Sequence, residues 1–598
     1  MTDKPSSMIP PILRDGWELR DIIIVVLTPI VLLPLPLGGS SESACAYVVI
    51  VTAVFWITEA LPIAVTSLLP IFLLPVTGVM GAKDVSSAYM NDTSMLFIGG
   101  LLVAAAIETW NIHKRIALRV LLFTGSEPRW LMMGLMLPTW FLSMWISNTA
   151  TTAMMVPIAN AVLVQLKQAK SAHIEGKENL ALELDDIEIT GSTEKKDIND
   201  RDDDRHTSEN AGSTNILSPE EEDEDLEHKR MCKALCLCIA YSANVGGTAS
   251  LTGTFPNIVM KGQADIIYQN HGSESGITFN TWMLFGLPTS FLVLIVLWCW
   301  LTLFLLRCRG CGSKTDPEVK EQIKSVIRQE YNKLGSLTFA QIAVLGHFLL
   351  LALLWITRDL GGVGGWGDMF TAKFATDSTP SIFVGMLLFI FPSALPAVFC
   401  CRPKSGSQKI KPLLDWNTTQ SKLPWGVFLL LGGGFALAKA SSKSGLSAWL
   451  AEELNALQYL EPWVINLILC YIATFATEVT SNTAICTLIM PIIGQLALNL
   501  HVNPLYFMLP TAIATSFAFM LPVATPPNAI VFSYGHLRVV DMCISGFTMN
   551  ILSVLVLILA TETWGNAYFG FQSFPSIFLA NSTLPIPVPR NLTNSSLA

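Results

Sequence analysis

Apolar segments of membrane-spanning length recur along the whole 598-residue chain, and this recurrence restricts the fold more than any other feature. Residues 282–306 and 339–356 are two of these segments. About 20 apolar residues are enough for a helix to cross the hydrocarbon core of a bilayer. Only 14% of the residues are charged, against roughly 25% in an ordinary soluble domain. We therefore expect an all-α polytopic membrane protein with about 11 transmembrane helices and shorter re-entrant pieces.

Charge is concentrated in one segment, residues 167–230, which holds 20 acidic and 9 basic residues. The rest of the chain has 26 acidic and 28 basic residues, so this segment has a net charge of −11 and the rest of the chain has +2. A segment so rich in Asp, Glu, Ser and Asn buries too little apolar surface to become ordered. We expect a disordered acidic insertion here, with a calcium or partner site as the alternative.

Charge and glycosylation signals predict how the chain is oriented. Basic residues beside apolar runs, such as His113-Lys114-Arg115, indicate cytoplasmic ends. Asn581, Asn591 and Asn594 begin glycosylation acceptor sequences in a tail with almost no basic charge. The expected division is a cytoplasmic arm at 1–20, a first repeat at 21–306 containing the insertion 167–230, a polar linker at 307–338, a second repeat at 339–564 and an extracellular tail at 565–598.

Three pairs of short motifs occur in the same order in the two halves of the chain. Ser147-Asn148-Thr149 begins 48 residues after Gly99, and Ser481-Asn482-Thr483 begins 48 residues after Gly433. The third pair is Thr254-Phe255-Pro256-Asn257 and Thr525-Pro526-Pro527-Asn528. The first half has 63 additional residues between its last two motifs, almost the length of the acidic segment. These matches indicate an internal duplication with an insertion in one copy.

Each motif interrupts an apolar run with polar residues or glycines. Unpaired backbone groups exposed to lipid cost several kcal/mol each, so such breaks persist only where they line a buried or water-filled cavity. Matching interruptions in two halves are typical of a secondary-transporter site near the membrane midplane. Hydrogen bonding between helices is the alternative for the Ser-Asn-Thr motifs. The glycine motifs at Gly99-Gly100 and Gly432-Gly433-Gly434 either pack helices closely or form hairpin tips.

The polar side chains of these motifs are all neutral. Their oxygens and the carbonyls of unwound backbone suit a hard cation such as sodium, while a helix that begins at Ser-Asn-Thr offers its positive end to a carboxylate. No Lys or Arg lies within ten residues of either motif, so bound cations would have to offset the charge of a dianion. We expect Glu478 to support the site rather than to carry a proton. Since no nucleophile, phosphate loop or metal cluster is evident, we expect neither an enzyme nor a cofactor.

Several long strings resemble the divalent anion/sodium symporter family, the sodium-coupled di- and tricarboxylate and sulfate transporters of animals. The strings are Trp56-Ile57-Thr58-Glu59-Ala60-Leu61-Pro62, Trp110-Asn111-Ile112-His113-Lys114-Arg115-Ile116-Ala117-Leu118, Leu142-Ser143-Met144-Trp145-Ile146-Ser147-Asn148-Thr149 and Met520-Leu521-Pro522-Val523-Ala524-Thr525-Pro526-Pro527-Asn528-Ala529-Ile530-Val531-Phe532. The resemblance implies two inverted repeats, two re-entrant hairpins, a dimeric scaffold domain and a transport domain that moves as an elevator.

The resemblance also implies the ligands of the site. The first sodium ion would be held by the carbonyls of Ser143, Ser147 and Gly253 and by Asn148, and the second by the carbonyls of Thr477, Thr480 and Ala524 and by Asn482. Substrate carboxylates would meet Asn148, Thr149, Asn482, Thr483, Thr525 and Pro526. The sulfate branch tends to have Pro after the second Ser-Asn, where Thr483 stands here, so the chain looks like the carboxylate branch. Phe255 is bulkier than the Gly or Ala usual there and leaves succinate-like and citrate-like substrates both open.

The function predicted from the sequence is sodium-coupled import of di- or tricarboxylates by a homodimer in the plasma membrane. The expected partners are small carboxylate anions, sodium and the lipid bilayer, and nucleic acid is not expected. One alternative is a sodium/sulfate symporter. Another, of a different class, is an anion channel or a non-transporting sensor.

Overall fold

The computed structural model describes residues 19–123, 127–164, 219–306, 317–359, 364–371, 374–395, 410–453 and 459–579. These ranges are helical, and one isolated antiparallel bridge joins Pro392 to Pro412. Within them, eight helices are long and apolar enough to cross a membrane, and five shorter apolar helices accompany them. The expected all-helical membrane architecture is confirmed, whereas a total of 11 crossings stays a prediction.

The first half of the chain is a series of helices, and two of the segments between them contain predicted motif residues. In order, the helices are α2 (Arg20–Val31), α3 (Pro34–Leu37), α4 (Ser41–Thr58), α5 (Ile63–Thr66), α6 (Leu69–Val76), α7 (Ala82–Tyr89), α8 (Asp92–Thr109), α9 (Ile112–Phe123), α10 (Pro128–Ser143), the helix Asn148–Val164, α12 (Pro219–Gly247), α13 (Phe255–Gln269) and α14 (Phe279–Leu305). Residues 144–147 form a hairpin tip after α10, and residues 248–254 form a break between α12 and α13.

The second half repeats this order of hairpin, broken helix and long helix. It comprises α15 (Pro317–Lys333), α16 (Phe339–Arg358), α17 (Ser378–Ile390), α18 (Trp416–Lys422), α19 (Trp425–Ser444), α20 (Leu446–Glu453), α21 (Pro462–Ala476), α22 (Asn482–Asn499), α23 (Pro504–Ala514), α24 (Pro526–Ser533), α25 (Val539–Ala560) and α26 (Asn566–Phe569), with short turns at Trp366–Met369, Thr561–Gly565 and Ser576–Phe578. Residues 477–481 form the second hairpin tip, and residues 515–525 form the second break.

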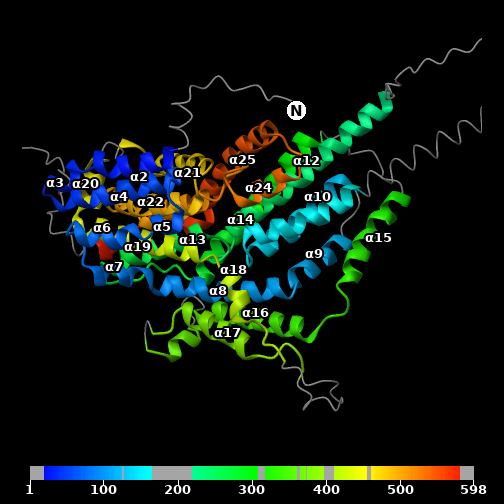
Figure 1. Cartoon of the computed structure of the whole chain (residues 1–598), viewed down its shortest axis with the longest axis horizontal. Helices are drawn as coiled ribbons and strands as arrows, with labels where there is room; N and C mark the ends of the chain where they lie inside the picture. Colours follow the sequence, from blue (N-terminus) through cyan, green and yellow to red (C-terminus); the bar gives the residue numbers. More distant parts are fainter. Residues whose placement is uncertain are drawn as a thin grey trace, which may run out of the picture.

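The two hairpins lie toward opposite ends of the molecule (Figure 1). The helix α10 lies toward the end where α9, α12 and α15 are found, whereas α21 and α22 lie toward the end that holds α3 and α20. The packing is alike in both halves, since α10 packs on α12 as α21 packs on α23, and α14 packs on α25. This arrangement allows the two hairpin tips and the two helix breaks to lie close together inside the molecule.

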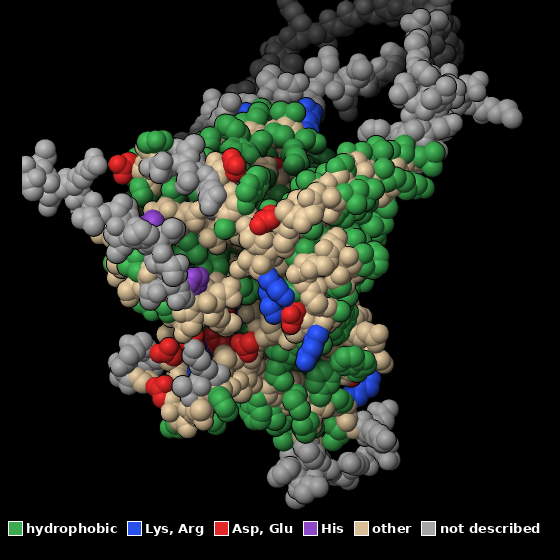
Figure 2. Space-filling view, turned by 90° about the vertical axis from the view of Figure 1, so that its left-hand side faces the viewer, with side chains coloured by type: hydrophobic (Ala, Val, Ile, Leu, Met, Phe, Trp, Pro, Cys, Tyr) green, Lys and Arg blue, Asp and Glu red, His purple; other side chains and the backbone are tan. Residues whose placement is uncertain are grey.

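Lipid-facing character is clear at the N-terminal end of the described chain. The helix α2 has no buried residue, and Ile22, Val26 and Ile30 are exposed. Figure 2 shows a face on which hydrophobic side chains predominate and charged side chains form small separate groups. Such a surface suits hydrocarbon as its surroundings, because helices satisfy their own backbone hydrogen bonds.

The glycine motifs pack helices closely and are not hairpin tips. Gly99 lies within α8, where an added Cβ would overlap Ser381 of α17. Gly432 lies within α19, where an added Cβ would overlap the ring of Tyr89 from α7. A glycine at each position therefore lets a neighbouring helix approach its backbone.

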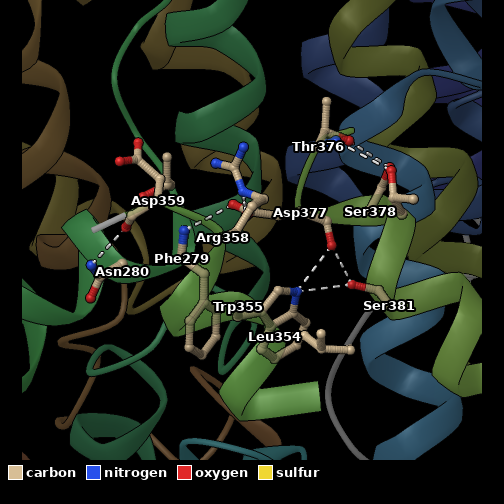
Figure 3. A network of polar contacts seen from close by, with 12 residues as sticks. Phe279, Asn280, Leu354, Trp355, Arg358, Asp359, Thr376, Asp377, Ser378 and Ser381 are labelled. Carbon is tan, nitrogen blue, oxygen red and sulfur yellow. Dashed lines mark hydrogen bonds and ion pairs between the residues drawn. The ribbon is translucent and has the colours of Figure 1, made fainter. Parts of the chain in front are cut away.

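A polar network joins the start of α14 to α16 and α17 (Figure 3). The Asp377 carboxylate accepts a hydrogen bond from the backbone N–H of Phe279 (3.0 Å) and forms an ion pair with Arg358. The Trp355 indole donates to the carbonyl oxygen of Asp377 at 3.0 Å. Asp377 is buried, so this network ties the long helix of the first half to the helices that pack on α8.

The expected division of the chain stays a prediction, and helices lie within or across three of its segments. Residues 219–230, expected to belong to the disordered insertion, form the first turns of α12, while residues 165–218 lie outside the described residues. The expected linker 307–338 contains α15. The final long helix continues past residue 564 as far as Phe569. In each case a local helix forms within a segment whose composition is polar or mixed, so composition alone does not decide where a helix begins or ends.

Candidate functional site

Both Ser-Asn-Thr motifs stand where a hairpin tip passes into a helix. The helices begin at Asn148 and Asn482, directly after Ser147 and Ser481. The Ser147 hydroxyl accepts a hydrogen bond from the backbone N–H of Ala150 at 3.2 Å, as expected for a helix N-cap. Both motifs therefore present free N–H groups and the positive end of a helix dipole.

The two helix breaks are held by the same side chain in the same way. The Asn257 amide donates to the carbonyl oxygens of Gly247 (3.1 Å) and Ser250 (2.8 Å), which precede it by ten and seven residues. The Asn528 amide donates to the carbonyl oxygens of Ala518 and Leu521, both at 3.0 Å, at the same two offsets. The repeat seen in the sequence thus extends to individual hydrogen bonds.

The first hairpin tip contacts the first break. A Cβ added to Gly247 would lie 2.7 Å from Asn148 Oδ1 and 3.2 Å from the carbonyl oxygen of Gly253. The Ser143 hydroxyl lies 2.6 Å from Asn148 Oδ1 and 2.7 Å from the carbonyl oxygen of Ala243. Asn148 and Gly253, predicted to share a sodium ion, are therefore brought together, and only glycine at position 247 leaves room for them.

The second hairpin tip is bound to the second break through Glu478. Its carboxylate accepts hydrogen bonds from the backbone N–H groups of Phe519 (2.8 Å), Met520 (3.0 Å) and Leu521 (3.1 Å) and from the Asn550 amide (2.7 Å). Five hydrogen bonds in all satisfy this buried charge, the fifth being a second contact of Met520. Glu478 thus joins the second tip to the second break, and its supporting role in the site stays a prediction.

Several buried oxygens at the tips and breaks have no hydrogen-bond partner within the described structure. They are Thr480 Oγ1, Asn482 Oδ1, Asn257 Oδ1 and Asn528 Oδ1. Buried polar atoms normally have partners, so an unpartnered oxygen beside a break is available to a ligand. Oxygen atoms of hydroxyl and amide groups are suitable ligands for a hard cation.

A cavity of about 920 Å³ lies between the tips and the breaks. Ten of the predicted site residues line it, namely Ser147, Asn148, Thr149, Gly253, Thr480, Asn482, Thr483, Ala524, Thr525 and Pro526. Ser143 and Thr477 do not line it, and both are fully buried. Phe255 lines the cavity and makes an edge contact with Phe97 of α8, with 5.3 Å between ring centroids.

The cavity also contains residues that the sequence analysis missed. Asn244 of α12 donates a hydrogen bond to Thr525 Oγ1 at 3.1 Å and so joins the two halves. In the sequence, Asn244 is a single amide residue directly after an apolar run. Polar residues at such positions in membrane helices are candidates for functional sites. Glu59, Glu108 and Lys422 line the cavity as well. Although no basic residue lies near the Ser-Asn-Thr motifs in the sequence, Lys422 lines the same cavity in the folded structure.

Lys422 is the last residue of α18, whose first turn is well defined. The Asp415 carboxylate caps this helix by accepting a hydrogen bond from the backbone N–H of Thr418 at 2.8 Å. That hydrogen bond holds the pKa of Asp415 below its usual value. Lys422 in turn lies 3.4 Å from a Glu108 carboxylate oxygen.

The predicted glycosylation sites Asn581, Asn591 and Asn594 lie outside the described residues.

Comparisons with known proteins cover almost the whole chain. The profile of a family described as the sodium:sulfate symporter transmembrane region matches residues 15–571. The Na(+)/citrate cotransporter of Rattus norvegicus is 44% identical over 93% of this chain and 97% of its own length. Solute carrier family 13 member 2 of Homo sapiens is 44% identical over 97% and 98%. The Na(+)/dicarboxylate cotransporter 3 of Mus musculus is 39% identical over 97% and 98%.

Proposed function

The chain belongs to the sodium:sulfate symporter family, and we propose that it is a sodium-coupled symporter that imports di- and tricarboxylates. The observation that carries this proposal is the convergence of two Ser-Asn-Thr helix starts, one from each hairpin, on a single cavity with two helix breaks. The relatives named as citrate and dicarboxylate cotransporters favour carboxylates over sulfate. Transport by such a site needs no covalent chemistry and no cofactor.

The substrate carboxylates bind at the two helix starts. Each start offers backbone N–H groups that the helix itself cannot use, together with amide and hydroxyl donors from its own side chains. We assign this role to Asn148 and Thr149 in the first half and to Asn482 and Thr483 in the second. Thr525 and Pro526 complete the wall between them, since both line the same cavity.

Two sodium ions bind beside the carboxylates, one at each pairing of tip and break. The first uses the Asn148 side chain and the carbonyls of Ser143, Ser147 and Gly253; the second uses the Asn482 side chain and the carbonyls of Thr477, Thr480 and Ala524. The contact of Asn148 and Gly253 around Gly247 supports the first group. The buried, unpartnered Asn482 Oδ1 supports the second.

The wider arrangement follows from the repeated order of elements. The two halves act as inverted repeats, and the hairpins, broken helices, α14 and α25 move together as an elevator against the remaining helices, which form the scaffold of a homodimer. We place the protein in the plasma membrane, with residues 1–20 cytoplasmic and residues 565–598 extracellular. The glycosylation sites in that tail belong to the same proposal.

Uptake of labelled succinate and citrate by expressing cells tests this function. Uptake should fall to the background of untransfected cells when choline replaces sodium. Unlabelled dicarboxylates should compete, while sulfate should not. Uptake that persists in choline would refute sodium coupling, and competition by sulfate would favour the sulfate symporter. Current without a fixed ratio of sodium to substrate would indicate a channel.

A further inference from the structure

Three side chains supply all the charge among the residues that line the cavity. They are Glu59, Glu108 and Lys422, and we call them the charge rim. The Lys422 ammonium lies 3.4 Å from a Glu108 carboxylate oxygen, and the two side chains are 27% and 36% exposed. Glu59 is exposed. The rim is thus accessible to water, whereas the Ser-Asn-Thr motifs on the same cavity are neutral.

Each member of the rim stands at or near the end of a helix. Glu59 directly follows α4 in a left-handed conformation, with φ of 52°. Glu108 lies in the last turn of α8, and Lys422 ends α18, which Asp415 caps at its start. The helices that carry Glu108 and Lys422 pack on one another. These positions are therefore set by separate pieces of secondary structure and do not depend on the hairpin tips.

The rim has a net charge of −1, because Lys422 offsets one of the two carboxylates. An ion inside the cavity is therefore subject to this charge as well as to the neutral motifs. The Coulomb energy is proportional to the charge of that ion, so the rim favours sodium and opposes a trianion more than a dianion. In water such effects decay over about 8 Å at physiological salt, so they act only at short range.

We propose that the charge rim tunes the relative access of sodium, dicarboxylates and tricarboxylates to the cavity, with Lys422 as the residue that eases the passage of anions. This inference rests on the proposed symport function and adds a specificity determinant to it. Lys422 acts on the ion at a distance through the net charge of the rim, and it is not a ligand of the bound substrate.

The test uses Lys422→Gln in sealed membrane vesicles of both orientations. At low ionic strength, where the Debye length is about 30 Å, one unit of rim charge about 10 Å away in water changes affinity by up to about 2-fold per unit charge on the ion. The KM should therefore rise about 4-fold for succinate and about 8-fold for fully ionised citrate. The sodium concentration for half-maximal transport should fall about 2-fold. These changes should appear when the labelled anion is on the side to which the cavity opens.

Further variants separate the effect of the net charge of the rim from the effect of a direct side-chain contact. Glu108→Gln alone should lower the KM of both anions, with the larger effect on citrate. The double variant Lys422→Gln with Glu108→Gln restores a net charge of −1 and should return both KM values close to wild type. Lys422→Arg should behave as wild type. Lys443→Gln is the matched control, because Lys443 forms a similar pair with Asp84 (3.8 Å) but does not line the cavity.

Equal effects on succinate and citrate would overturn the proposal, as would a double variant that is as impaired as Lys422→Gln. Either result would mean that Lys422 acts through direct contact or through packing. Surface labelling of each variant corrects the rates for the amount of protein. The wild type serves as the separate check on function: if its uptake lacks sodium dependence, the symport proposal fails whatever the rim variants do.

Discussion

At the scale of single residues, the two site asparagines are equivalent in sequence but not in surroundings. Asn148 Oδ1 lies 2.6 Å from the Ser143 hydroxyl, whereas Asn482 Oδ1 is buried without a partner in the described structure. An unpartnered buried oxygen costs free energy until a ligand reaches it. The second tip therefore has more to gain from an ion than the first.

Replacement of either asparagine should abolish transport. Asn148→Ala or Asn482→Ala removes a sodium ligand and a substrate donor together, so uptake should fall to background while surface expression is kept. Labelled succinate uptake over a range of sodium concentrations measures this. Asn270→Ala, at an exposed position after α13, is the control and should transport normally. Sodium dependence like that of wild type in both site variants would refute the shared site.

Phe255 should limit the size of the substrate. Its ring lines the cavity against Phe97, so Phe255→Ala should provide room for a third carboxylate. The ratio of the citrate KM to the succinate KM should fall by about 10-fold, a typical effect of a change in an apolar pocket. An unchanged ratio, measured in the same cells, would show that the ring does not contact the substrate.

At the scale of elements, sequence patterns predicted the interruptions well and their packing poorly. The Ser-Asn-Thr motifs lie at helix starts and the Pro-Asn motifs follow breaks, because N-caps and prolines act locally. The place of the glycine motifs was left open, since close packing depends on a partner helix that the sequence does not identify. Asn244 was missed because its partner Thr525 is distant in sequence, and Lys422 was missed because it reaches the cavity from an element far from both motifs.

Glu478 should couple the second tip to the second break. Glu478→Gln keeps the size of the side chain but puts an amide donor against backbone N–H groups that now donate to a carboxylate. Hydrogen bonds to a charged group contribute about 1.5–3 kcal/mol, so the sodium requirement should rise by about 10-fold or more. Sodium activation curves at saturating succinate measure this. A curve that coincides with wild type would show that the tip keeps its shape without the carboxylate.

At the scale of the whole molecule, the sequence predicted a neutral transport body with one acidic segment. The helical membrane architecture and the family are confirmed, but the charge balance of the cavity could not be predicted. Residues far apart in the chain, such as Glu59 and Lys422, line the same cavity only in the folded structure. Counting charges near a motif therefore underestimates the charge around the site that the motif builds.

The acidic segment should be dispensable for transport. The second half builds its hairpin and broken helix without a counterpart of residues 167–218. Replacing these residues with a flexible Gly-Ser linker should leave the KM for succinate within about 2-fold of wild type, because a flexible connection adds little constraint to its ends. Uptake normalised to surface protein is the measurement. A large change in KM would show that the segment takes part in the transport cycle.

The paired asparagines of the two breaks have a consequence for the empty carrier. Asn257 and Asn528 each hold two carbonyl groups of their own loop through side-chain hydrogen bonds. These hydrogen bonds within the chain thus maintain the bend of each loop without an ion. Because the loop is already ordered, the binding of an ion there costs little conformational entropy of the protein. An ion that reaches either break therefore meets a loop that the chain already holds in its bent shape.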